Sequence, residues 1–135
     1  MSHFKIFDIA GSSLAAQSVR LNTIASNLAN ADTVAGSEAE VYRARMPVFE
    51  LAPIADSQDQ AGVRVTDVVE SQAAVARRYE PGHPQADGEG YIYSSNVNSV
   101  EEMVNMISSA RSYQSSVEVL NTAKDLLMRT ISMGR

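Results

Sequence analysis

The stretch FDIAGSSLAAQSVRLNTIASNLANA (residues 7–31) decides the fold. It places a large apolar residue every seven positions, and a companion row follows at the same spacing. The two rows are Phe7, Leu14, Leu21 and Leu28, and Ala10, Gln17, Ile24 and Ala31. Apolar residues that recur every three to four places are typical of a helix that packs against another helix. We therefore predict a helix over residues 3–30, about 42 Å long at 1.5 Å per residue.

The C-terminal end repeats this pattern and contains no proline. Its main row is Met106, Tyr113, Leu120 and Leu127, and its companion row is Met103, Ala110, Val117, Lys124 and Ile131. Ser99 and Glu102 have the spacing of a capping box, in which each side chain binds a free backbone N–H group of the other residue. Gly134 marks a helix end. These signals predict a second helix over residues 99–133.

The middle of the chain has the signals of strands and turns. All four prolines lie within residues 47–84. Alternating side chains predict three short strands, at residues 42–48, 63–69 and 91–93. Pro47 places the first of them at a sheet edge, and the sequence EPGHP (residues 80–84) predicts an ordered turn.

The predicted fold class is α+β, with long N- and C-terminal helices that form a coiled-coil-like pair and a small β-rich segment inserted between them. Three segments follow: an N-terminal axial helix (1–31), a middle β/turn segment (32–95) and a C-terminal axial helix (96–135). Net charge divides the same way, at +1, −6 and 0, and sums to the overall −5. The acidity therefore lies in the middle segment.

Composition excludes several function classes. A net charge of −5 argues against nucleic-acid binding, which needs a basic face. Because the chain has no cysteine, it has no disulfide, thiolate metal site or cysteine nucleophile. The longest apolar run is four residues, too short to cross a membrane, and the N-terminus lacks the apolar stretch of a cleaved signal peptide. We expect no catalysis, no cofactor and no metal.

His83, Asp87 and Glu89 are the best candidates for a metal or acid–base cluster, and they suggest a small hydrolase as one alternative function. Their spacing, His-x3-Asp-x-Glu, fits no strong ligand motif. A solvated turn is the favoured interpretation.

Three stretches resemble the flagellar rod and hook axial proteins, and in particular the proximal rod proteins of that family. The first is ASNLANADT (residues 25–33), and the second is YEPGHPQADGEGY (79–91), which is followed by NVN (96–98). The third is VEEMVNMI (100–107) with ARSYQ (110–114). The resemblance covers nearly the whole chain.

The resemblance implies a structural subunit that is exported without a cleaved signal peptide and polymerises through its terminal helices. It would form a rod that spans the periplasm, transmits torque and lets export substrates pass. Its implied partners are copies of itself, other rod proteins, and base and export-gate components of the basal body, without direct membrane insertion. The candidate assembly residues are Phe7, Leu14, Leu21, Ile24, Asn27, Leu28, Asn30, Met103, Met106, Tyr113, Val117, Leu120, Leu127 and Ile131.

Some alternatives stay open at this point. Asn27 and Asn30 either cap the first helix or bridge to a neighbouring subunit, and capping is favoured. Gln17 and Lys124 interrupt the apolar rows (the seams) of the two helices, where polar residues either fix register and partner choice or face the channel or solvent. The helices pair within one chain, between chains, or both. A soluble helical-hairpin adaptor or export-associated binding module is the main alternative function.

Overall fold

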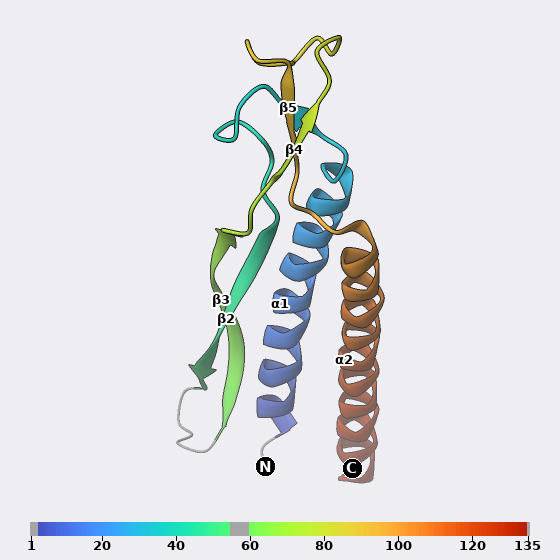
Figure 1. The fold of residues 1–135 in the computed structure, drawn as a ribbon. Coiled ribbons are helices and arrows are strands. Elements are labelled where there is room, and N and C mark those ends of the chain that lie inside the picture. The colour runs from blue at the N-terminus through green and yellow to red at the C-terminus, as the bar shows by residue number, and fades with distance from the viewer. Residues whose placement is uncertain (1–2, 55–59, 135) are drawn as a thin grey trace. The chain divides into compact units, whose positions relative to one another are not determined.

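The computed structural model describes residues 3–54 and 60–134, without the side chain of His3. The outermost residues of the predicted terminal segments, and residues 55–59 of the middle segment, lie outside this range. Helix α1 (His3–Ala29) and helix α2 (Ser99–Met133) stand at the two ends of the chain, with short strands between them in sequence (Figure 1). This arrangement confirms the predicted α+β class and both helices.

Helix α2 begins with a different cap from the one predicted. Asn98 Oδ1 accepts hydrogen bonds from the backbone N–H groups of Val100 (3.1 Å) and Glu101 (3.3 Å). The predicted capping box of Ser99 and Glu102 is therefore wrong by one residue, because the side chain of Asn98 already binds free N–H groups of the first turn. At the other end, the N–H of Gly134 donates to the carbonyl of Thr130 (3.2 Å), so the predicted helix end is confirmed.

Helix α1 ends in a cap formed by Asn30. Its side-chain Nδ2 donates to the carbonyl of Ser26 (2.8 Å), and its backbone N–H donates to the same carbonyl (3.2 Å). These bonds occupy one of the carbonyl groups that a helix end leaves without an intrahelical partner. The capping role predicted for Asn30 is confirmed.

Strands β2 (Arg45–Pro53) and β3 (Ala61–Glu70) form a two-stranded hairpin whose strands run in opposite directions (Figure 1). β3 contains the predicted strand 63–69. The prediction of a strand at 42–48 is wrong in position, because β2 starts three residues later and continues to Pro53. The N–H of Ala44, just before β2, is bound to Asn96 Oδ1 (2.7 Å), while its carbonyl accepts a hydrogen bond from the N–H of Ser71, just after β3 (2.7 Å).

A second sheet has the order β1-β5-β4, in which β5 (Tyr91–Ser94) lies between β1 (Val34–Ala35) and β4 (Ala76–Tyr79). Both pairings are antiparallel. β5 confirms the predicted strand at 91–93, whereas β1 and β4 were not predicted. The turn after β4 is also confirmed, since the N–H of His83 donates to the carbonyl of Glu80 (3.0 Å).

The chain divides into two compact units. The first unit contains residues 1–21, 47–67 and 107–135, and the second contains residues 22–46 and 68–106. Both helices contribute to both units, so the three-segment division along the sequence stays a prediction.

The core of the first unit lies between α1 and its neighbours. Figure 1 shows the N-terminal part of α1 between the hairpin and the C-terminal part of α2, and the buried apolar residues there are Ala10, Ala16 and Ala123. The hydroxyl groups of Ser13 and Ser116 lie 3.1 Å apart and form a hydrogen bond between the helices. Small side chains thus allow α1 and α2 to pair closely within one chain.

The core of the second unit is formed by larger apolar residues. Ile24 of α1, Val41 and the fully buried Ile92 of β5 are its buried apolar side chains. The large residues of the main α1 row (Phe7, Leu14, Leu21 and Leu28) are only half-buried. Ala10 and Ile24 of the companion row are buried, as are Ala16 and Asn27, which belong to neither row. Within the described residues, neither helix is long and apolar enough to span a membrane.

Candidate assembly surface

Helix α2 exposes apolar side chains near its N-terminus, in the second unit. Val100 is 72% exposed and Val104 is 61% exposed, and Met103 between them is also exposed. Spacings of three and four residues place all three on one side of the helix. An exposed apolar cluster of this kind is typical of a surface that another protein covers.

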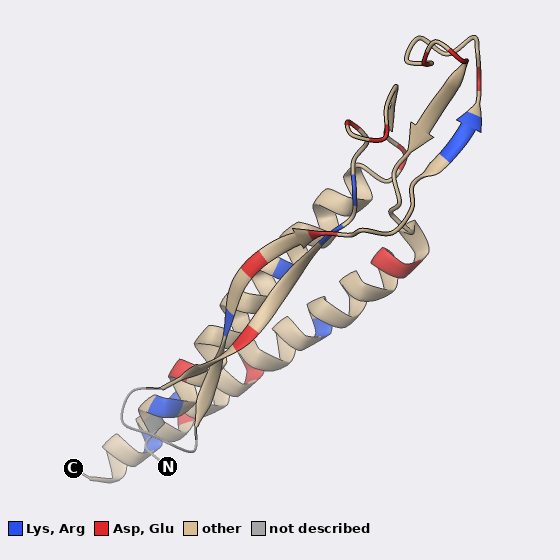
Figure 2. Cartoon of the chain, turned by 60° about the vertical axis from the view of Figure 1, so that its left-hand side comes forward, with Lys and Arg blue, Asp and Glu red and all other residues tan. Residues whose placement is uncertain are grey.

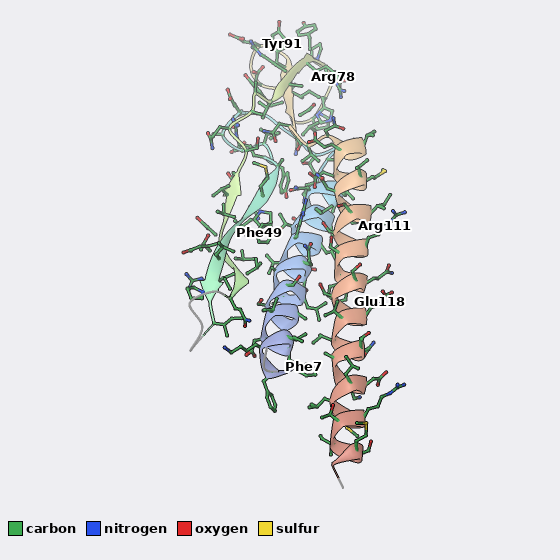
Figure 3. All side chains as sticks on the ribbon, turned by 90° about the horizontal axis from the view of Figure 1, so that it is seen from below. Phe7, Phe49, Arg78, Tyr91, Arg111 and Glu118 are labelled. Carbon is green, nitrogen blue, oxygen red and sulfur yellow. The ribbon has the colours of Figure 1, made fainter. Side chains whose placement is uncertain are left out.

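A second exposed row follows α2 through the first unit. Val119, Leu126 and Met133 are seven residues apart and are 50%, 51% and 83% exposed. Arg111 and Glu118 project from the helix on the side away from α1 (Figure 3). The apolar row therefore lies on a helix that also exposes charged residues, and Ile107, Tyr113, Met128 and Ile131 are further exposed apolar residues of α2 in the first unit.

A shallow apolar groove runs beside this row, between α1 and α2 of the first unit. It consists of two adjoining hollows of ≈ 270 Å³ and ≈ 460 Å³, which share Ile6, Ser115 and Val119 in their walls. The rest of the lining combines small residues, such as Ala10 and Ala123, with larger ones, such as Leu126. Because small side chains allow a close approach of helix backbones, the groove has the shape and chemistry to receive a further helix.

The predicted assembly residues fall into three classes of exposure. Met103, Tyr113 and Ile131 are exposed, and Ile24 and Asn27 are buried. The remaining nine are half-buried: Phe7, Leu14, Leu21, Leu28, Asn30, Met106, Val117, Leu120 and Leu127. The half-buried and exposed residues keep surface that a neighbour can cover, and their part in assembly stays a prediction.

Ile24 and Asn27 have a different place from the one expected of assembly residues. Asn27 is 1% exposed, and its side chain is bound within its own chain by Tyr42, Arg45 and Glu102. Its buried amide neither caps the helix through its side chain nor reaches the surface. We therefore assign Ile24 and Asn27 to the core of the second unit rather than to a contact surface.

The two polar residues that interrupt the seams differ in environment. Lys124 is exposed. Gln17 is half-buried beside Phe49 of the hairpin, in a hollow of the first unit, and its Oε1 has no hydrogen-bond partner among the described residues. Figure 3 shows Phe49 projecting from the hairpin. Lys124 thus faces solvent, whereas Gln17 lies at the packing surface between helix and hairpin.

The predicted cluster of His83, Asp87 and Glu89 is used by the turn itself. Asp87 Oδ1 accepts hydrogen bonds from the N–H groups of Glu89 (2.9 Å) and Tyr91 (2.8 Å), and His83 Nδ1 accepts one from the N–H of Gln85 (3.1 Å). Within residues 3–54 and 60–134, no three His, Cys, Asp or Glu side chains gather as a metal site. These polar groups hold a loop in shape.

Glu89 pairs with Arg77 of β4. The guanidinium and carboxylate are 2.7 Å apart, and the guanidinium lies 3.7 Å from the centre of the Tyr91 ring. The hydrogen bond to Glu89 raises the pKa of Arg77 above its ordinary value. β4 carries Arg77 and Arg78 side by side, as the blue strand in Figure 2 shows. Both are paired with nearby glutamates, so the strand does not present unpaired positive charge.

Two family models match the two ends of the chain. A model described as flagella basal body rod protein matches residues 7–36. A model described as flagellar basal body rod FlgEFG protein C-terminal matches residues 89–133. These ranges include most of α1 and α2.

The chain is similar over its whole length to flagellar basal-body rod proteins named FlgC. The flagellar basal-body rod protein FlgC of Salmonella typhimurium (strain LT2) is 52% identical over 135 residues, which cover 100% of both chains. The FlgC of Escherichia coli O157:H7 gives the same figures. The FlgC of Buchnera aphidicola subsp. Baizongia pistaciae is 36% identical over 137 residues, with 100% of both chains covered. The chain belongs to the FlgC family of flagellar basal-body rod proteins. It is a structural subunit of the rod in the bacterial basal body, as the resemblance predicted.

Some exposed residues of this FlgC-family rod protein were missed by the sequence interpretation. Val119, Leu126 and Met133 also repeat every seven residues, but Asn105 and Ser112 occupy the preceding positions of that row. Val100 and Val104 stand one turn apart beside Met103. Counting the apolar residues of every heptad row would have found the first group, but not Val104, whose row continues with Arg111 and Glu118.

Proposed function

We propose that this chain builds the rod by packing the exposed apolar side of α2 against helices of neighbouring subunits. The neighbours are copies of the chain and other flagellar rod proteins. The observation that carries the proposal is the exposed row Val119, Leu126 and Met133. Burial of one large apolar side chain contributes about 1.5–3 kcal/mol, so covering this row favours assembly.

The groove beside the row supports the same conclusion. Its walls combine small residues with Ile6 and Val119, which suits a helix laid along it. A helix in this position covers both Val119 and Leu126, since Leu126 borders the larger hollow. Contacts of this kind between copies of one chain are heterologous and extend into a helical polymer when they do not close.

We propose, in addition, the wider setting that the family resemblance implies. The assembled chain forms part of a tube that spans the periplasm, transmits torque and lets export substrates pass. The base and the export-gate components of the basal body are its further neighbours. It reaches this site without a cleaved signal peptide, and its action there needs no catalytic step and no cofactor.

The variant L126D tests the proposal. It places a charge in the row, while N121D adds the same charge at an exposed polar position of α2 and serves as the control. We expect L126D to abolish swimming and to remove the chain from isolated basal bodies, while the purified variant keeps its helix content. We expect N121D to swim normally. Normal rods in cells that carry L126D would contradict the proposal.

A further inference from the structure

The apolar rows of α1 and α2 do not by themselves determine the register in which the two helices pair. The main rows of both helices repeat every seven residues. Because such rows look alike after a shift of one heptad, hydrophobic contact alone accepts neighbouring registers. A buried polar contact is the kind of feature that distinguishes registers, because it is satisfied in only one of them.

Asn27 makes such a contact in the second unit. Its Oδ1 accepts hydrogen bonds from the Tyr42 hydroxyl (2.8 Å) and the Arg45 N–H (2.9 Å). Its Nδ2 donates to the Arg45 carbonyl (2.9 Å) and to Glu102 Oε2 (3.1 Å). The amide has two donors and two acceptor sites, and all four are used. The Asn27 side chain thus binds the first turn of α2 and the start of β2 at once.

A shifted pairing would break this arrangement. Glu102 lies in the first turn of α2, and sliding α2 by seven residues moves it by about 10.5 Å along the helix axis. The Nδ2 group of Asn27 would then lose its acceptor at a position that is 1% exposed. Leaving a buried donor without a partner is unfavourable, whereas the apolar rows would meet again.

We propose that Asn27 selects the register in which α2 pairs with α1. It is a positioning residue that acts through Glu102, and the inference concerns the fold of a single subunit rather than the contacts between subunits. The competing explanation is that the short connection from Ser95 to Asn98 sets the register by its length.

Engineered disulfides can distinguish the registers, because the chain has no cysteine. Ser13 and Ser116 have their hydroxyl groups 3.1 Å apart, so the pair S13C/S116C forms a disulfide in the observed register. The pair S13C/S109C forms one when α2 has slid by one heptad. The yield of each intramolecular disulfide is measured on the purified full chain after mild oxidation, by non-reducing electrophoresis of the monomer.

The variant N27L removes the polar contact, and N22L is its control at an exposed asparagine of α1. With Asn27 intact, we expect only the S13C/S116C disulfide. In N27L, we expect the yield of the shifted S13C/S109C disulfide to rise about tenfold or more, as the loss of one buried hydrogen-bond constraint implies. N22L should leave both yields unchanged. If N27L keeps the observed pair at full yield without the shifted one, the connection sets the register and the proposal is wrong.

If N27L yields neither disulfide, a second experiment tests the proposal by exchanging the amide and the carboxylate between residues 27 and 102. N27D places an oxygen opposite the Glu102 carboxylate, and the amide introduced by E102Q supplies a donor again. We expect N27D to lower the S13C/S116C yield and the double variant N27D/E102Q to recover it. A double variant no better than N27D would overturn the proposal, because the effect would then not pass through Glu102.

Discussion

Gly62 of β3 lies directly over Ser12 of α1, so closely that a Cβ at residue 62 would come within 2.5 Å of the Ser12 hydroxyl oxygen. That hydroxyl donates to the carbonyl of Ile9 (2.8 Å) and accepts from the N–H of Val63 (3.1 Å). The hairpin therefore docks on the helix through a glycine and a serine. The serine cannot turn away without leaving a strand N–H unpaired.

This contact predicts that G62A destabilises the chain. The added methyl group must displace either the strand or the serine, and overpacking of this kind costs about 1–3 kcal/mol. The control is G11A on α1, where a Cβ meets nothing within 4 Å and the exchange raises helix stability by up to about 1 kcal/mol. Thermal unfolding followed by circular dichroism measures both. A G62A midpoint equal to that of the unmodified chain would show that the hairpin does not pack on α1 in this way.

The helix cap of α2 predicts unequal effects at two adjacent residues. N98A removes the acceptor of two backbone N–H groups and should lower the free energy of unfolding by about 1 kcal/mol. S99A removes a hydroxyl that does not cap the first turn, so we expect almost no change in the free energy of unfolding. Chemical denaturation compares the two variants. If S99A lowers the free energy of unfolding more than N98A does, Ser99 rather than Asn98 caps the helix, as the predicted capping box requires.

The ion pair of Arg77 and Glu89 is exposed, so E89A should be nearly silent. Exposed ion pairs contribute about 0–1 kcal/mol, and Asp87 still binds the N–H groups of the turn. The raised pKa of Arg77 adds stability that is present below the ordinary arginine pKa and is lost only as the pH rises above it. E89A cells should therefore swim normally near neutral pH. A swimming defect as severe as that of L126D would indicate a contact or site in this loop.

Hydrogen exchange should differ between the two helices of the purified chain. In the first unit, α1 has neighbours on two sides, whereas residues 128–134 of α2 are all exposed. We expect the amides of this end of α2 to exchange faster than those around Ala16, because protection follows local packing. Mass spectrometry of peptides from the purified chain and from isolated rods measures the difference. If these amides exchange no more slowly in rods than in the purified chain, neighbours do not cover this part of α2.

Several features of the rod protein follow from local sequence alone. The seven-residue apolar rows predict both helices, because helical side-chain spacing is a property of the nearby chain. Tyr91, Ile92 and Tyr93 predict the central strand of the small sheet, and the prolines and glycines around residues 80–84 predict its turn. The family resemblance in residues 25–33 and 79–91 is likewise a property of the sequence and leads to the rod.

Tertiary structure decided which of these residues are covered. The rows containing Leu120 and Leu126 have the same period, so the sequence does not determine which one faces α1; packing leaves Leu126 exposed and Leu120 half-buried. The position of β2 likewise depends on Asn96 and Asn27, which bind the N–H groups of Ala44 and Arg45. The partners of Asn27 stand 15, 18 and 75 residues away in the sequence. No local pattern identifies such partners, because they meet only when separate elements pack together.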